Sequence, residues 1–168
     1  MRPPRTCLQG LVTGLILLTG ATLVQGGTKA DLVLLTPQEA RELRLSDALW
    51  RPPVVLRSLP RGPRVVVRRP GLTTTPDGPV IVTGSPTDLV ISFEETGAPV
   101  DMGSLEVRAK KGFFSVSLTD RLKPYLRGAI LEATAIKIPE GRFLIQVEIA
   151  DRSGGRTVDT FRLEVKAQ

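Results

Sequence analysis

The chain has 168 residues, of which 24% are charged and 41% are hydrophobic, and its formal net charge is +6. It contains no histidine, and its single cysteine is Cys7. A chain without histidine lacks the commonest general base and a common metal ligand, so the composition argues against most kinds of enzyme and metal site. This length is enough for one sandwich-sized domain with a real core and an N-terminal extension.

The first residues follow the plan of a secretory signal peptide. Arg2 and Arg5 precede an apolar stretch from Leu11 to Val24, and the small residue Gly26 follows it. The apolar stretch is about fourteen residues long, shorter than the roughly 20 that span a hydrocarbon core. We therefore predict a signal peptide over residues 1–26, with no stable membrane span after cleavage. The mature chain then has no cysteine and no disulfide, which favours a bacterial periplasmic or secreted location.

Positive charge is concentrated before the folded region. Residues 70–168 contain twelve bases and thirteen acids, so that region is nearly neutral. The high isoelectric point therefore does not indicate a basic groove, and we expect no nucleic acid partner. Residues 41–69 contain two acids and eight arginines, which are Arg41, Arg44, Arg51, Arg57, Arg61, Arg64, Arg68 and Arg69.

Residues 27–63 are predicted to form a short helix followed by an extended arm. Thr36 can cap a helix, Pro37 fits its first position, and Glu39 can close a capping box. This helix is expected to continue to Leu45. Prolines and a glycine between residues 49 and 63 are too closely spaced for a helix or a central strand, so we expect an arm there.

The arm has two interpretations. Its arginines either keep it solvated or place it on an anionic surface, which would be phospholipid head groups or an acidic partner protein. Trp50 is the only tryptophan, and aromatic residues with arginine are enriched at protein interfaces; alternatively, its ring packs on the edge of the domain. The predicted binding residues in this region are Trp50, Arg51, Arg57, Arg61 and Arg64.

From residue 64 onward, apolar and polar residues alternate with period two, which is typical of half-buried strands. Turn signals rich in glycine, proline and aspartate separate these runs. We predict an all-β, antiparallel immunoglobulin-like β-sandwich of seven or eight strands over residues 64–168, preceded by an arm with one short helix. The expected strands centre on residues 65–67, 80–82, 89–93, 105–110, 114–118, 130–136, 143–149 and 161–165.

The folded region resembles bacterial immunoglobulin-like domains of secreted proteins in the order of three stretches: LVISFEETGAPVDMGSLEVR, SLTDRLKPY and IPEGRFLIQVEIADRSGGRTVDTFRLEV. In such domains a final hairpin follows a Pro-x-Gly turn and contains an Asp-x-x-Gly loop. The chain is also similar to small uncharacterised exported proteins of proteobacteria that share the Thr119, Arg121, Pro124 and Tyr125 segment. This resemblance covers roughly residues 64–165; it implies export and a single immunoglobulin-like domain, and it implies no activity.

The segment from Thr119 to Tyr125 is the least strand-like part of this region. Thr119 can cap a single helical turn, and the chain is expected to cross between sheets there. Arg121 and Tyr125 are candidate binding residues that would form a small recognition surface with Lys123 and Arg127. The alternative is that Arg121 ties down loop backbone while the Tyr125 ring packs at the sandwich edge.

No catalytic group is apparent. Glu94 and Glu95 are adjacent on a strand, so they point to opposite faces and cannot act as a facing pair of carboxylates. No serine is paired with a buried lysine, and Met102 alone cannot form a copper site. We therefore expect a chain that is not an enzyme, with no cofactor and no metal.

The leading hypothesis is a noncatalytic exported interaction module that docks onto another envelope component through its arm or a sheet edge. The probable partner is an envelope protein or an anionic surface. The alternative is an accessory or carbohydrate-binding domain that acts beside a secreted enzyme. An exposed Tyr125 or Phe113 beside a groove would favour that alternative.

Overall fold

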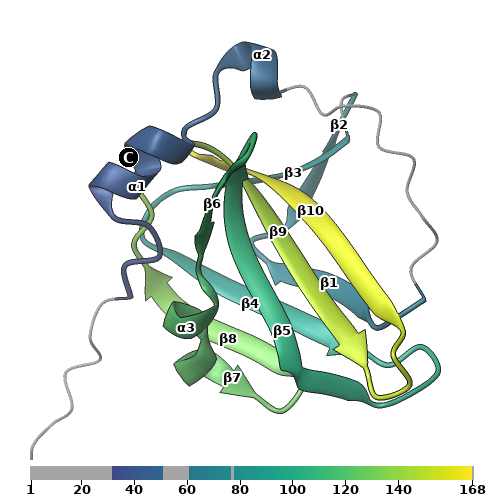
Figure 1. Ribbon diagram of the computed structural model, residues 1–168. Helices are drawn as coiled ribbons and strands as arrows, with labels where there is room; N and C mark the ends of the chain where they lie inside the picture. The colour runs from purple at the N-terminus through teal and green to yellow at the C-terminus, as the bar shows by residue number, and fades with distance from the viewer. Residues whose placement is uncertain (1–31, 51–60, 77, 168) are drawn as a thin grey trace, which may run out of the picture.

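The computed structural model describes residues 32–50, 61–76 and 78–167, which form a two-layer β-sandwich with short helices at its margins (Figure 1). Ten strands and four short helices are present in these residues. The helices are α1 (Pro37–Leu43), α2 (Asp47–Trp50), α3 (Thr119–Leu122) and the 3₁₀ helix η1 (Lys123–Tyr125). The strands are β1 (Arg64–Arg69), β2 (Leu72–Thr75), β3 (Gly78–Thr83), β4 (Thr87–Glu94), β5 (Val100–Lys111), β6 (Phe114–Ser117), β7 (Leu126–Arg127), β8 (Ile130–Ile136), β9 (Gly141–Asp151) and β10 (Arg156–Val165).

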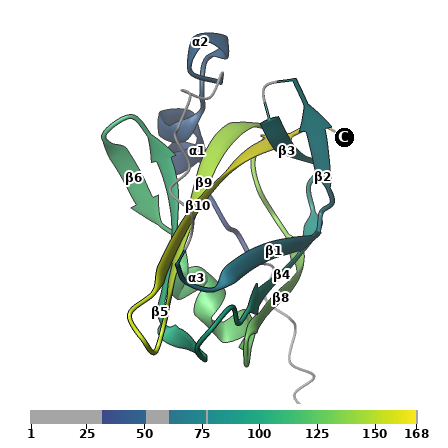
Figure 2. The same cartoon turned by 90° about the vertical axis from the view of Figure 1, so that its right-hand side faces the viewer.

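The strand order confirms an immunoglobulin-like sandwich. One sheet has four strands in the order β1-β4-β8-β7, and the other has six in the order β2-β3-β10-β9-β5-β6. The four-stranded order corresponds to the A-B-E-D sheet of immunoglobulin domains. In the other sheet, β10, β9 and β5 correspond to G-F-C, and three further strands extend it: β6 on one side, and β3 and β2 on the other. Figure 2 shows the two layers edge-on, with β1, β4 and β8 in one and β9 and β10 in the other. All the expected strands are present, and β2 and β7 are additional.

One strand pair departs from the expected antiparallel arrangement. β3 and β10 run parallel, with Val80 opposite Arg162 and Thr83 opposite Val165. The other pairs between named strands are antiparallel, and the β9–β10 hairpin keeps an unbroken register from Gly141 to Ala150. The chain crosses from β1 into the other sheet before β3. β3 is therefore not joined to β10 by a hairpin turn, and the two strands run in the same direction.

Period-two alternation places the core between the sheets. Phe143, Val147 and Ile149 on β9 are completely buried, and they alternate with half-buried residues on the outer face. Ile91 and Phe93 from β4 meet them from the four-stranded sheet. One strand departs from the pattern: Phe114 on β6 is 46% exposed because it lies beside the turn at the protruding end of the β5–β6 hairpin.

The helix before the sandwich also contributes to this core. The predicted capping box is confirmed: the Thr36 hydroxyl accepts from the Glu39 N–H at 3.2 Å, and the Glu39 carboxylate accepts from the Thr36 N–H at 2.8 Å. The helix ends at Leu43, two residues earlier than expected. Leu35 and Leu43 are completely buried in the same core as the sandwich residues. The first strand begins at Arg64, the predicted start of the sandwich, so residues before that boundary also belong to the core.

The expected helical turn at Thr119 is present as α3, but Thr119 does not cap it. Leu118 occupies the N-cap position and makes no side-chain cap. The Thr119 hydroxyl instead accepts from the Val107 N–H at 2.9 Å, so it holds α3 against β5. No helix in the described ranges is long and apolar enough to cross a bilayer.

Candidate functional site

Trp50 lies on the outer face of the six-stranded sheet, between two arginines. The guanidinium carbon of Arg142 on β9 is 5.3 Å from the centre of the indole ring, and that of Arg162 on β10 is 5.2 Å from it. Both distances are in the range of cation–π contacts. We call Trp50, Arg142 and Arg162 the Trp50 clamp. The ring of Trp50 therefore packs on the sandwich, but it lies over the inner strands β9 and β10 and not at the edge of the domain, where the second interpretation placed it.

The clamp is tied to its surroundings by polar contacts. Arg162 is only 5% exposed, and its guanidinium donates to the Thr75 hydroxyl at 3.0 Å and to the Trp50 carbonyl at 3.4 Å. Arg142 donates to Glu164 at 3.2 Å and to Asp47, and these carboxylates, Glu164 first, raise the pKa of Arg142. The clamp therefore fixes α2 to the sheet.

The other described end of the arm is also fixed. Pro63 is completely buried, and the Gly62 carbonyl accepts a hydrogen bond from the Thr96 hydroxyl at 2.9 Å. A Cβ on Gly155 would lie 2.3 Å from the Arg61 carbonyl oxygen, so this stretch packs directly against the β9–β10 turn. Arg61 itself is exposed.

The β9–β10 turn is organised by Asp151. One oxygen of its carboxylate accepts from the Ser153 N–H at 2.9 Å, the Ser153 hydroxyl at 2.7 Å and the Gly155 N–H at 2.8 Å. These bonds, the Ser153 hydroxyl first, lower the pKa of Asp151. The Asp151 carboxylate therefore closes the turn against which Gly62 packs.

The structure therefore separates the predicted arm residues. Trp50 packs into the clamp, whereas Arg61 and Arg64 are exposed beside the β9–β10 turn and at the start of β1. Arg51 and Arg57 lie outside the described residues. Their predicted role in binding stays a prediction.

Arg121 and Tyr125 do not lie together on one exposed surface. The Arg121 guanidinium makes two hydrogen bonds to the Glu39 carboxylate, at 2.7 and 2.8 Å, and one to the Leu34 carbonyl at 2.7 Å. This pair, with the Thr36 cap, lowers the pKa of Glu39 from 4.5 to about 2. Tyr125 is half-buried against the core, and Arg127 is exposed. The contacts of Arg121 match the alternative in which it ties down backbone, here that of the segment before α1.

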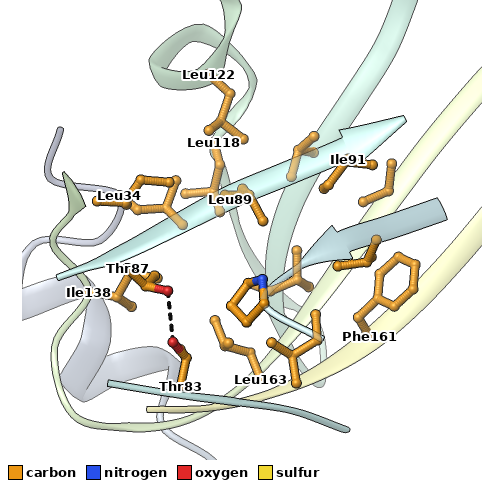
Figure 3. Close-up of a pocket in the computed structure, with 17 residues that line it drawn as sticks. Leu34, Thr83, Thr87, Leu89, Ile91, Leu118, Leu122, Ile138, Phe161 and Leu163 are labelled. Atoms are coloured by element: carbon orange, nitrogen blue, oxygen red, sulfur yellow. Dashed lines mark hydrogen bonds between the residues drawn. The ribbon is translucent and has the colours of Figure 1, made fainter. Parts of the chain in front are cut away.

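A small apolar cavity lies between the sheets (Figure 3). Its volume is about 50 Å³, and its lining includes Leu89, Ile91, Phe161 and Leu163. A cavity of this size and polarity provides no partners for a polar ligand or an ordered water. It is a gap in packing and offers no chemistry.

A second, open pocket lies next to the clamp. Its lining mixes acids and bases, among them Arg44, Glu140, Glu164 and Lys166. The described residues contain no group of three or more His, Cys, Asp or Glu side chains placed to hold a metal ion. Glu94, one of the two adjacent acids weighed from the sequence, forms an ion pair with Arg68 at 3.2 Å. No arrangement in this part of the chain resembles a catalytic site.

Sequence reasoning missed two features of this region. Arg162 lies on the outer face of β10, where Trp50 covers it from 112 residues away in the sequence. The Arg121–Glu39 pair joins residues 82 apart, and nothing local indicates it. The tryptophan did provide a signal, because a lone large aromatic residue among arginines is a candidate for cation–π packing.

Together, the two sheets and the buried anchors before β1 define the chain as an immunoglobulin-like β-sandwich. No protein-family profile and no curated protein sequence matches it. Among solved structures it is similar to CopC from Methylosinus trichosporium OB3b, with 13% identity, a TM-score of 0.32, and coverage of 51% of this chain and 81% of CopC. It is also similar to murine CRIg, with 8% identity, a TM-score of 0.35, and coverage of 62% of this chain and 98% of CRIg. Likenesses at this level carry no argument about what the chain does.

Proposed function

We propose that the chain is a noncatalytic, exported interaction module that docks onto another component of the cell envelope through its arginine-rich arm. The observation that supports this proposal is that both residues flanking segment 51–60 are fixed on the sandwich. Trp50 is held in the clamp, and Arg61 packs against the β9–β10 turn. A binding segment whose ends are fixed on a rigid domain loses less entropy on binding than a free tail.

The charge of the arm supports an acidic partner. Arg51, Arg57 and Arg61 carry three positive charges, and segment 51–60 contains no acid. Arginine is enriched at protein interfaces and makes bidentate contacts with carboxylates. We infer an envelope protein with an acidic face as the partner, and a periplasmic or secreted location follows from the signal-like residues 1–26.

Site-specific photocrosslinking in the exporting cells tests this proposal. A photoreactive amino acid at Arg57 reports contacts of the arm, and one at Ser115 reports contacts of the β6 edge, the alternative docking surface. The proposal expects a defined protein adduct from position 57. An adduct from position 115 alone would move docking to the sheet edge, and no adduct from either position would contradict the interaction module.

A matched pair of variants shows whether the charges matter. Arg51, Arg57 and Arg61 are replaced together by serine, and the control replaces the exposed Arg69, Arg127 and Arg152 by serine, which removes the same charge elsewhere. We expect the first variant to lose at least about tenfold in partner affinity and the control to stay within about twofold. Equal losses would show that only net charge matters. Mass spectrometry of the exported protein measures cleavage near Gly26 independently.

A further inference from the structure

The tip of the β5–β6 hairpin carries an aromatic side chain that the fold does not use. β5 ends at Lys111 opposite Phe114, so Gly112 and Phe113 form a two-residue turn. Gly112 has φ 59°, which suits the first position of such a turn. Phe113 is fully exposed, and Phe114 beside it is 46% exposed.

The fold provides no structural reason for an aromatic residue at position 113. Two-residue turns favour small or polar residues, because their side chains point into water. The six-stranded sheet ends before Phe113, and this side chain belongs to neither the core nor its partly buried margin. The exposed ring of Phe113, with the partly exposed ring of Phe114 beside it, therefore forms an apolar surface at the tip that the fold does not use.

The surroundings of the tip are basic. Lys110 and Lys111 directly precede the turn, and the Lys111 ammonium donates to the Glu42 carbonyl at 2.9 Å, which places the end of α1 beside the hairpin. Arg41 on α1 is exposed, and Glu42 is the one acid of this helix that is not paired with Arg121. The tip therefore combines exposed aromatic rings with a local excess of positive charge.

Further apolar surface lies at the same end of the molecule. Figures 1 and 2 both show the β5–β6 hairpin, α1 and α2 at one end of the sandwich, away from the β9–β10 turn. Leu49 on α2 is 51% exposed. Several elements at this end of the molecule thus carry exposed apolar or basic residues.

We propose that this end of the sandwich contacts an anionic lipid bilayer, with Phe113 inserted at the level of the head groups and Lys110 and Lys111 against lipid phosphates. Lysine is depleted at protein–protein interfaces, whereas lysine combined with aromatic residues is typical of membrane interfaces. A convex hairpin tip also cannot bury the roughly 800 Å² per partner of a stable protein interface. Lys110, Lys111 and Phe113 are not part of the arm, so variants at the tip and variants in the arm test the two proposals separately.

A fluorescent label near the tip tests the proposal while leaving Phe113 in place. Ser115 is replaced by cysteine in the full chain carrying Cys7→Ser, which leaves no other cysteine, and is labelled with a polarity-sensitive dye. Vesicles contain phosphatidylcholine alone or mixed with phosphatidylglycerol, together with a lipid bearing a quencher in its head group. The same dye at Val158→Cys, which is 48% exposed on β10, is the positional control.

We expect quenching at position 115 with phosphatidylglycerol vesicles and little with phosphatidylcholine alone. Phe113→Ser and the double variant Lys110→Gln, Lys111→Gln should each weaken this quenching at least about tenfold in lipid concentration. Phe113→Leu should retain it because an apolar side chain remains. Arg127→Gln with Arg152→Gln, the charge-matched control, should change it less than about twofold.

Three results would overturn the proposal. The first is no quenching at position 115, including the case in which vesicles bind only through residues 11–24. The second is equal quenching at positions 115 and 158, which would indicate adsorption without orientation. The third is quenching that does not depend on phosphatidylglycerol or on Phe113.

Discussion

The β9–β10 turn and the β5–β6 turn end two hairpins of the same sheet, and they are built differently. The register places them at opposite ends, since Val100 pairs with Asp151 whereas Lys110 pairs with Leu144. The β9–β10 turn is closed by Asp151 and packed against residues 61 and 62. The β5–β6 turn consists of a glycine and a fully exposed phenylalanine.

This contrast distinguishes turn side chains that stabilise the fold from turn side chains that do not. Both hairpins meet the backbone requirement with a glycine of positive φ, Gly154 in one and Gly112 in the other. The side chains of the first turn stabilise the fold through hydrogen bonds. The Phe113 side chain of the second adds nothing to the core, which makes that turn the better candidate for contact with a surface.

The largest effect is expected from Gly155→Ala. Its Cβ would lie 2.3 Å from the Arg61 carbonyl oxygen and 2.5 Å from the Asp151 carboxylate, so backbone must move. We expect a loss of about 3 kcal/mol in the free energy of unfolding, measured by urea denaturation. Gly97→Ala, where nothing lies within 4 Å, should change stability by less than about 0.5 kcal/mol. Equal effects would show that the arm does not pack on this turn.

Glu39→Gln tests the contact between α1 and α3, which the Glu39–Arg121 pair makes. The end of α1 lies beside the β5–β6 hairpin. The pair is partly solvated, so we expect a loss of about 1–2 kcal/mol at neutral pH rather than the full value implied by the lowered pKa. The exposed residue Glu42, changed to Gln, is the control and should lose less than about 0.5 kcal/mol.

The pH dependence of this loss has a defined sign. The pKa of Glu39 is about 2 in the folded chain, below its ordinary value of 4.5, so the carboxylate stabilises the fold above pH 4.5. This contribution disappears as the pH falls from about 4.5 toward 2. Unfolding curves of the native chain and of Glu39→Gln should therefore converge at acidic pH. A constant difference down to pH 2 would contradict the assignment.

Gly112→Ala should have a smaller effect. Its φ of 59° is strained for alanine, but nothing lies within 4 Å of the added methyl group. We expect a loss of about 1 kcal/mol by urea denaturation, and a smaller loss for Gly112→Asn, since asparagine tolerates this conformation better. A loss as large as that of Gly155→Ala would mean that the two turns are equally packed.

Phe113→Ser should leave stability unchanged within about 0.5 kcal/mol, because the ring is fully exposed. Thermal unfolding monitored by circular dichroism measures this directly. Unchanged stability together with weaker vesicle binding would sharpen the contrast between the two turns. A loss above about 1 kcal/mol would instead assign the ring a folding role.

The sequence predicted the sandwich because alternation of period two reports burial strand by strand. β2 and β7 were missed because they are short and each contains a single apolar residue, Leu72 and Leu126, so no alternation can be seen in them. The parallel contact between β3 and β10 was missed because pairing direction depends on the path of the chain between sheets.

The candidate sites were less predictable. Trp50 was singled out by composition, yet its partners Arg142 and Arg162 are supplied by strands about a hundred residues later, and no local pattern indicates that. Arg121 was considered for recognition, but the capping-box residue Glu39 occupies its guanidinium. From the sequence, an exposed Phe113 beside a groove was considered only as a sign of carbohydrate binding. In the structure Phe113 lies on a turn and lines neither of the two pockets.

The position of β10 has a consequence for how the chain matures. β10 lies between β9 and β3, and β3 contacts the rest of its sheet through that strand. A ribosome releases β3 long before it releases β10, so the β2–β3 hairpin has no sheet to join during most of synthesis. Completion of the six-stranded sheet therefore waits until residues 156–165 have been synthesised.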